Sequence, residues 1–140
     1  MITVPAGKKG SLGLVILVLL WAVFAHAGDV PQIKPDELKA MIESKKADFV
    51  VVDVQPKGAY ALGHIKGAIN LPWSSDITSA GSLPRNKVLI LYCDCAHEED
   101  STDAAQQLTT KFGFTKVRTL EGGWSGWQRL GYPIEKSKGT

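Results

Sequence analysis

Residues 88–120, VLILYCDCAHEEDSTDAAQQLTTKFGFTKVRTL, carry the clearest pattern of secondary structure in this chain. They open with Val88-Leu89-Ile90-Leu91-Tyr92, a continuous apolar run typical of a strand buried on both faces. Ser101 to Phe112 places its apolar side chains on one helical face, and Gly113 stands where a left-handed residue caps a helix. Val117 to Leu120 is a second apolar run. The segment therefore predicts a strand, a loop, a helix and another strand.

The preceding part of the chain supplies the remaining elements. We expect an extended lead-in from Gly28 to Ile33, a helix from about Pro35 to Lys46, a buried strand from Phe49 to Val54 and a short strand from Ala68 to Leu71. Lys45 and Lys46 are expected in the last turn of that helix, where their positive charges would interact favourably with the helix dipole. Alternating helices and apolar strands predict an α/β fold with a parallel sheet covered on both faces. The functional site should lie at the carboxyl ends of the strands, where the loop from Cys93 to Asp100 begins.

Composition and charge restrict the function classes. A chain of 140 residues that is 44% apolar fits one globular domain and excludes a collagen-like, coiled-coil or highly charged disordered protein. Residues 1–27 contain Lys8, Lys9 and no acid, so the rest of the chain has 14 basic and 14 acidic side chains. This neutral domain offers no electrostatic surface for a phosphate backbone, and we expect no nucleic-acid partner.

The first 27 residues have the pattern of a signal peptide. Basic residues precede the apolar stretch from Leu12 to Phe24, and the small-x-small triplet Ala25-His26-Ala27 follows it. Cleavage after Ala27 would leave one exported domain, residues 28–140, with the periplasm as its expected location. The alternative is an uncleaved membrane anchor, since the uncharged run from Gly10 to Ala27 reaches the lower limit of about 17 residues for a membrane span. The membrane would then be contacted only through this segment, with the domain outside the cytoplasm.

Cys93 and Cys95 are the only cysteines. An oxidising compartment permits a disulfide between them, but so small a ring gains little unfolded-state entropy, which makes a structural staple the weaker interpretation. A cysteine that follows a buried strand and precedes a helix lies where backbone N–H groups and the helix dipole favour a thiolate. We therefore predict a reactive thiol, with an inert buried cysteine as the alternative.

Three separated motifs carry a resemblance to a known family. They are Val51-Val52-Asp53-Val54 with residues 60–72, then Leu91-Tyr92-Cys93, and finally residues 113–124 continued through Trp127, Gly131 and Pro133. With these motifs the chain resembles the rhodanese family from about Ile33 to Lys136. The resemblance implies a five-stranded parallel sheet flanked by helices on both faces. It also implies a cysteine that accepts sulfane sulfur as a persulfide and passes it to a nucleophile, without a cofactor or a metal.

Most residues of these motifs are expected to be structural. The glycines and tryptophans in question are Gly63, Gly67, Gly122, Gly123, Trp124 and Trp127, which suit unusual backbone angles, close approach or core closure. His64 is expected to anchor a turn by hydrogen bonds rather than to act as a base. Asp53, at the end of a buried strand, is expected to organise its neighbours rather than to act as an acid.

The active-site loop departs from the family pattern because two cysteines compete for one role. In the family pattern the catalytic cysteine comes directly after the strand, which corresponds to Cys93 here. It also lies six positions before the hydroxyl residue that opens the helix, which corresponds to Cys95. We prefer Cys95 as the nucleophile, because the length of the backbone cradle before the helix controls where the sulfur lies. The substrate-binding loop is then predicted to comprise Ala96, His97, Glu98, Glu99, Asp100 and Ser101. The Tyr-Cys-x-Cys-x-x-Glu-x-x-Ser pattern also resembles a variant loop of some exported or membrane-linked rhodanese-like domains.

The charge of the loop is a second departure. Its acids are Asp94, Glu98, Glu99, Asp100 and Asp103, its one potential cation is His97, and Gln55 stands where the family often has arginine. Each carboxylate within about 6 Å opposes a thiolate by roughly 0.7 to 3 kcal/mol, whereas a helix N-terminus returns about 0.3 to 2 kcal/mol. Asp100 or Ser101 could instead cap the helix. These charges predict that thiosulfate is a poor sulfur donor.

The leading hypothesis is an enzyme, an exported sulfurtransferase whose partners are a small sulfane-sulfur donor and a thiol or other nucleophilic acceptor. Cys93 is then expected to resolve the Cys95 persulfide, which releases sulfide and leaves a disulfide. One alternative is a thiol–disulfide redox protein that uses the same pair. Another is a non-catalytic binding module on a rhodanese fold, or a soft-metal module with Cys93, Cys95 and His97 as ligands. The sequence leaves the donor, the acceptor and the oligomeric state open.

Overall fold

The computed structural model describes residue 3 and residues 29–137. The elements are β1 (Gln32–Ile33), α1 (Pro35–Glu43), β2 (Phe49–Asp53), α2 (Lys57–Leu62), β3 (His64–Ile65), β4 (Ile69–Asn70), β5 (Val88–Tyr92), α3 (Glu99–Phe112), β6 (Val117–Leu120), α4 (Gly123–Arg129) and β7 (Ile134–Glu135). The signal peptide or anchor predicted for residues 1–27 lies outside the described residues, apart from residue 3. Within the described ranges, no helix has the length and apolar character needed to cross a bilayer.

A five-stranded parallel sheet forms the centre of the domain, with the strand order β1-β6-β5-β2-β4. The longest pairing joins β2 and β5, in which Phe49 lies opposite Val88 and Asp53 lies opposite Tyr92. A separate antiparallel pair, β3 and β7, closes one side of the molecule. The predicted parallel sheet is confirmed, including the apolar runs at β2, β5 and β6.

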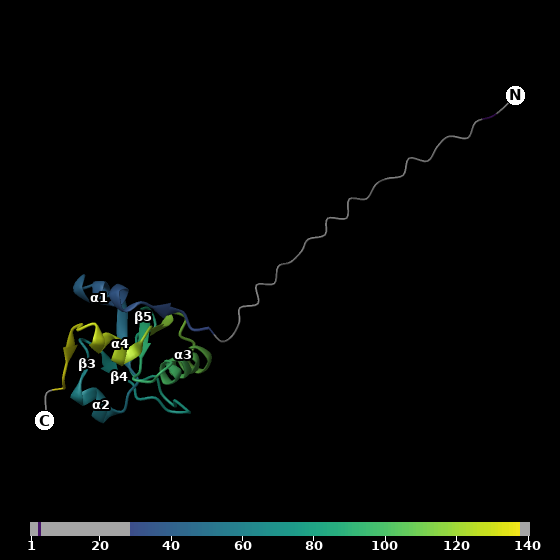
Figure 1. The fold of residues 1–140 in the computed structure, drawn as a ribbon. Coiled ribbons are helices and arrows are strands. Elements are labelled where there is room, and N and C mark those ends of the chain that lie inside the picture. Colours follow the sequence, from purple (N-terminus) through teal and green to yellow (C-terminus); the bar gives the residue numbers. More distant parts are fainter. Residues whose placement is uncertain (1–2, 4–28, 138–140) are drawn as a thin grey trace.

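Helices cover both faces of the sheet (Figure 1), and side chains of alternating direction along the strands divide the core into two clusters. One cluster packs Val52, Leu89 and Leu91 against Ala104, Ala105 and Leu108 of α3. The other packs Val51, Ile90 and Tyr92 against Leu38 of α1 and against Trp124 and Trp127 of α4. Both strands of the central pair are therefore apolar on both faces because each face is covered by a helix.

Two helix boundaries differ from the predictions. Helix α1 ends at Glu43, so Lys45 and Lys46 lie beyond it and not in its last turn. Ser44 ends the helix: its N–H donates to the carbonyl of Ala40 and its Oγ donates to the carbonyl of Met41, after which Lys45 turns to a φ of 54°. Helix α3 begins at Glu99, two residues earlier than the apolar periodicity indicated.

The end of α3 follows the prediction. Gly113 is left-handed, with a φ of 71°. Its N–H donates to the carbonyl of Thr109, and the N–H of Phe114 donates to the carbonyl of Leu108, a pairing that satisfies the last carbonyls of the helix.

Candidate functional site

The candidate site is the loop that joins β5 to α3. Cys93 follows the last residue of β5, and its carbonyl accepts a hydrogen bond of 2.9 Å from the N–H of Trp124. A disulfide joins Cys93 to Cys95, whose Cα atoms are 5.5 Å apart. The two cysteines differ in exposure, because Cys93 is 2% exposed within the core whereas Cys95 is half-buried. The loop therefore presents one of its two sulfur-bearing residues to solvent and buries the other.

An open pocket of about 740 Å³ lies over this loop. It is lined by Asp94, Cys95, Ala96, Gly122, Ser125, Gln128 and Arg129. Cys95 lines the pocket and Cys93 does not. The pocket is at the carboxyl ends of β5 and β6, the edge of the sheet at which the sequence predicted the site.

The residues predicted to form the substrate-binding loop separate into two groups. Ala96 lines the pocket with Cys95, and the neighbouring His97 is exposed. Glu98 is the N-cap of α3, so neither Asp100 nor Ser101 caps the helix; all three residues from Glu99 to Ser101 form its first turn.

Ser101 lies on the buried side of the loop. It is fully buried, and its Oγ lies 3.7 Å from the Sγ of Cys93 and donates to the carbonyl of Glu98 at 3.0 Å. The N–H of Thr102 donates to the same carbonyl. Ser101 therefore contacts the buried cysteine and not the pocket.

Glu98 holds the loop against the segment that follows β6. Its backbone is left-handed, with a φ of 54°, a conformation that costs a residue with a side chain about 1–2 kcal/mol. Its Oε1 accepts a 2.8 Å hydrogen bond from the N–H of Gly122. We infer that this bond helps to offset the backbone cost, since a hydrogen bond to a charged group contributes about 1.5–3 kcal/mol.

Most of the acids expected to repel an anion have partners of their own. Asp94 accepts a hydrogen bond of 2.5 Å from the hydroxyl of Ser125, and Asp103 accepts one of 2.8 Å from the indole N–H of Trp73. Glu99 accepts hydrogen bonds from its own backbone N–H and from that of His97, and these bonds lower the pKa of its carboxyl. These three loop acids therefore each accept a hydrogen bond from a donor near the loop, as Glu98 does.

Sequence reasoning missed the contribution of the segment after β6 to the pocket. Arg129 adds a cation to the lining, and within residues 29–137 its guanidinium has no hydrogen bond or ion pair. Gly122, Ser125 and Gln128 line the same pocket. The signal for them was available: β5 and β6 are parallel neighbours, so the residues that follow each strand meet at one edge.

Gly123 explains why this segment approaches the loop so closely. A Cβ atom at this position would lie 2.4 Å from the carbonyl oxygen of Cys93, and the φ of Gly123 is +50°. Only glycine combines this backbone angle with this approach. The structural role predicted for Gly123 is confirmed, as is core closure by Trp124 and Trp127, which are 7% and 0% exposed.

Asp53 is the centre of a buried hydrogen-bond network below the loop. Its carboxylate accepts bonds of 2.6 Å from the hydroxyl of Tyr92 and 2.8 Å from the N–H of Gln55. Burial raises the pKa of Asp53, and these hydrogen bonds oppose that rise. Burial, followed by the charge of Asp53, raises the pKa of Tyr92. Gln55, at the position where the family often has arginine, is buried and bonded to Asp53, so it does not reach the pocket.

His64 has the hydrogen bonds expected of a residue that anchors a turn. Its Nδ1 lies 2.8 Å from the carbonyl of Tyr60, and its Nε2 lies 3.3 Å from Oε1 of Glu135. Its ring stacks on that of Tyr60, with centroids 3.8 Å apart. These contacts join α2, β3 and β7, away from the residues that line the pocket.

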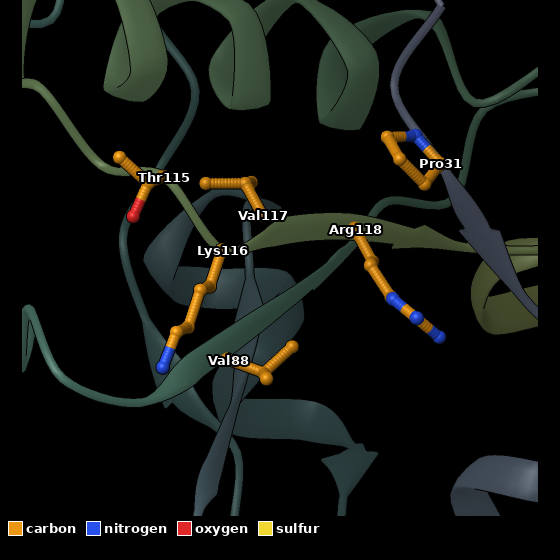
Figure 2. Close-up of a pocket in the computed structure, with 6 residues that line it drawn as sticks. All are labelled: Pro31, Val88, Thr115, Lys116, Val117 and Arg118. Atoms are coloured by element: carbon orange, nitrogen blue, oxygen red, sulfur yellow. The ribbon is translucent and has the colours of Figure 1, made fainter.

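Metal-ligand geometry and a second pocket complete the description of the site. In the part of the chain that the structure describes, no group of three His, Cys, Asp or Glu side chains is arranged to hold a metal ion, and the soft-metal role of Cys93, Cys95 and His97 stays a prediction. A second pocket, of about 260 Å³, lies at the opposite edge of the sheet, where Figure 2 shows Lys116 and Arg118 extending to either side of Val88. It is remote from both cysteines, because Val88 begins the strand that Cys93 follows.

Comparison with known proteins relates the loop and fold to one family. The model of the rhodanese-like domain matches residues 34–130. The thiosulfate sulfurtransferase GlpE of Pseudomonas fluorescens is 34% identical over 111 residues, which cover 78% of this chain and 94% of the relative. GlpE of Vibrio cholerae is 31% identical over 99 residues, covering 71% of this chain and 89% of the relative.

Solved structures agree with this relationship. The rhodanese-like domain of the Alr3790 protein from Anabaena has a TM-score of 0.65 at 28% identity and covers 80% of this chain and 88% of that one. The BH2092 protein from Bacillus halodurans has a TM-score of 0.67 at 28% identity and covers 76% of this chain and 77% of that one. The residues that match the family model extend from the residue before α1 to the residue after α4. They include β2, β4, β5 and β6 of the parallel sheet and the two-cysteine loop, and they leave out β1. The chain belongs to the rhodanese-like domain family.

Proposed function

We propose that this protein is an exported sulfurtransferase that carries sulfane sulfur as a persulfide on Cys95. The observation that supports Cys95 is its place in the lining of the pocket, while Cys93 is buried. A donor that enters the pocket meets Cys95, and an acceptor must reach the outer sulfur of the persulfide by the same route. The sulfurtransferase relatives support the reaction class.

The chemistry requires the reduced protein. The thiolate of Cys95 attacks the sulfane sulfur of the donor, and the donor leaves without that sulfur. A thiolate acceptor then attacks the outer sulfur of the persulfide, which breaks the bond to Sγ and returns Cys95 as a thiolate. The N-terminus of α3, which follows the loop, favours the thiolate in both steps.

The pocket supports an organic acceptor rather than an inorganic one. Its volume of about 740 Å³ is within the range of about 300–1,000 Å³ found for sites that bind drug-sized ligands. Arg129 offers a planar guanidinium that binds a carboxylate by two parallel hydrogen bonds. We therefore propose a thiol that carries a carboxylate as the acceptor class, with a small sulfane-sulfur compound as the donor.

Peptide mapping of the reduced protein tests the proposal. After exposure to polysulfide or thiosulfate, intact mass should increase by one sulfur, and the increase should map to Cys95. Cys95→Ser should abolish the adduct and Cys93→Ser should retain it. An adduct on Cys93 would keep the reaction class and reverse the residue, whereas no adduct from any donor on the folded, reduced protein would refute the sulfurtransferase.

The disulfide favours a second candidate, a thiol–disulfide redox protein that uses Cys93 and Cys95 without sulfur transfer. The two candidates differ in their need for Cys93. A redox couple loses its activity in Cys93→Ser, because no intramolecular disulfide forms. Sulfur loading on Cys95 survives the same substitution. Measuring both activities on this one variant therefore separates the two functions.

Export is proposed from the leader alone. The basic start, the apolar stretch and the Ala25-His26-Ala27 triplet support cleavage and release to the periplasm. The mass of the protein recovered from fractionated cells tests this proposal. A soluble product that begins at Gly28 would support cleavage, and a full-length product in the membrane fraction would support the anchor instead.

A further inference from the structure

The disulfide places its two sulfur atoms in different surroundings. Cys93 is 2% exposed and belongs to the core cluster that contains Ala104 and Ala105; Cys95 packs against the same cluster, but it is only half-buried and lines the pocket. A nucleophile that arrives from solvent therefore approaches the disulfide from the side of Cys95. This difference in burial favours attack on the sulfur of Cys95, with the sulfur of Cys93 as the leaving group.

We propose that the oxidised protein captures hydrosulfide and converts it to sulfane sulfur, with the Cys93–Cys95 disulfide as the electron acceptor. HS⁻ attacks the Sγ of Cys95; a new bond forms between the incoming sulfur and Cys95, and the bond between the two cysteines breaks. Cys93 leaves as a thiolate, and the proton of HS⁻ stays on the outer sulfur. The disulfide is reduced by two electrons, which the sulfide supplies. This inference rests on the proposed function, since its product is the same Cys95 persulfide, formed by the resolving step in reverse.

Ser101 supports Cys93 as the leaving group. Its Oγ lies 3.7 Å from the Sγ of Cys93 and donates to the carbonyl of Glu98 in the oxidised protein. That carbonyl also accepts the N–H of Thr102, so the hydroxyl of Ser101 can turn to a newly formed thiolate without leaving the carbonyl unpaired. Burial opposes the negative charge on Cys93, and a hydroxyl donor in the first turn of α3 offsets this cost. A leaving thiolate that is stabilised in this way departs faster.

The pocket admits a small anion. Arg129 is exposed and, within residues 29–137, its guanidinium has no ion pair. The carboxylate of Asp94, the one acid in the lining, accepts a hydrogen bond from Ser125. The approach to Cys95 therefore carries one free cation and one carboxylate that is already bonded.

Mass spectrometry of the full, oxidised chain under anaerobic conditions tests the inference in a single turnover. Sodium sulfide should add one sulfur and two hydrogens to the intact mass. Alkylation and peptide mapping should then find the persulfide on Cys95 and a thiol on Cys93. A persulfide on Cys93, two thiols without added sulfur, or no reaction would each overturn the inference.

Two variants connect the result to the mechanism. Ser101→Ala keeps both cysteines and should slow capture by about tenfold to a hundredfold, the effect of one hydrogen bond to a charged group. Thr102→Ala removes the neighbouring hydroxyl of the same helix and should leave the rate within about twofold. Equal rates in the two variants would refute the proposed stabilisation of the leaving Cys93 thiolate by Ser101.

A third variant keeps this inference separate from the proposed function. Cys93→Ser has no disulfide, so sulfide should give no persulfide, while polysulfide should still load Cys95. If polysulfide loads reduced wild-type protein and sulfide fails with the oxidised protein, the proposed function stands and sulfide capture is overturned. If neither reagent loads Cys95, both are overturned.

Discussion

Replacement of Gly123 by alanine should disturb the site more than an ordinary glycine substitution does. An alanine at a φ of +50° pays about 1–2 kcal/mol for the left-handed conformation. The same change at Gly131 costs a similar amount, because its φ is +67°, but a Cβ there meets no atom within 4 Å. At Gly123 the new Cβ would lie 2.4 Å from the carbonyl oxygen of Cys93, so the backbone must move.

Movement of the backbone at position 123 would break the buried 2.9 Å hydrogen bond from the backbone N–H of Trp124 to the carbonyl of Cys93. An unsatisfied buried group costs about 1–3 kcal/mol. Gly123→Ala should therefore lose about 1–3 kcal/mol more stability than Gly131→Ala. For a domain of this size each kcal/mol lowers the Tm by roughly 4–8 °C.

Thermal and urea denaturation of both variants measure this difference, and sulfur loading reports the effect on the loop. Gly123→Ala should have the lower Tm and should also load Cys95 more slowly, because Cys93 moves with its carbonyl. Gly131→Ala should load at the wild-type rate. Equal Tm values for the two variants would refute the claim that close approach, rather than the backbone angle, requires glycine at position 123.

Three further predictions address charge and packing. Burial raises the pKa of Asp53 above 3.8, so the folded state binds the proton of this carboxyl more tightly than the unfolded state does. The free energy of unfolding of the wild type, relative to that of Asp53→Asn, should therefore increase as the pH falls toward 3.8 and decrease as the pH rises. Urea titrations at several pH values would measure this difference. A difference that is independent of pH would contradict it. Arg129→Ala should slow the loading of Cys95 by thiosulfate by up to about fivefold, because an exposed charge pair contributes about 0.2–1 kcal/mol. Gln128→Ala, in the same pocket, should leave the loading rate unchanged. Equal rates for the two variants in stopped-flow loading would exclude anion binding by Arg129. Leu108→Ala, on the buried face of α3, should lower the free energy of unfolding in urea by about 2–5 kcal/mol. Leu130→Ala, at a position that is 50% exposed, should change it by about 0.5 kcal/mol or less. Similar losses in the two variants would contradict the assignment of the core.

The parallel sheet was predictable because its signal is local and strong. The runs at β2 and β5 are apolar at successive positions and rich in β-branched residues, a pattern typical of strands covered on both faces. The left-handed cap at Gly113 was predictable for the same reason, since the glycine directly follows the last turn of α3. The end of α1 was missed because Ser44 ends the helix through its own backbone and side-chain bonds, which compete with two favourable lysines that follow.

The partners of the loop acids were not predictable from the loop. Glu98 bonds to the N–H of Gly122, 24 residues away, and Asp94 bonds to Ser125, 31 residues away. Such pairings depend on how α4 is set against β5, and that position depends in turn on the glycine at 123. A count of nearby carboxylates in the sequence therefore contains no information about which donors they reach, and the predicted repulsion of a thiolate stays a prediction.

The two rules that selected different cysteines refer to two separate places in the loop, although Ser101, from which the second rule counts, lies in the first turn of α3 and does not open it. Cys93 keeps the place directly after the strand, where its carbonyl binds Trp124 and its sulfur lies beside Ser101. Cys95 keeps the place at the pocket, and the disulfide holds their Cα atoms 5.5 Å apart. In the mechanism that we propose, a nucleophile from solvent attacks Cys95, and the negative charge of the leaving thiolate falls on Cys93, beside the hydroxyl of Ser101. Under this proposal Cys93 is the partner that releases or re-forms the bond to Cys95, which is why the loop would contain a second cysteine.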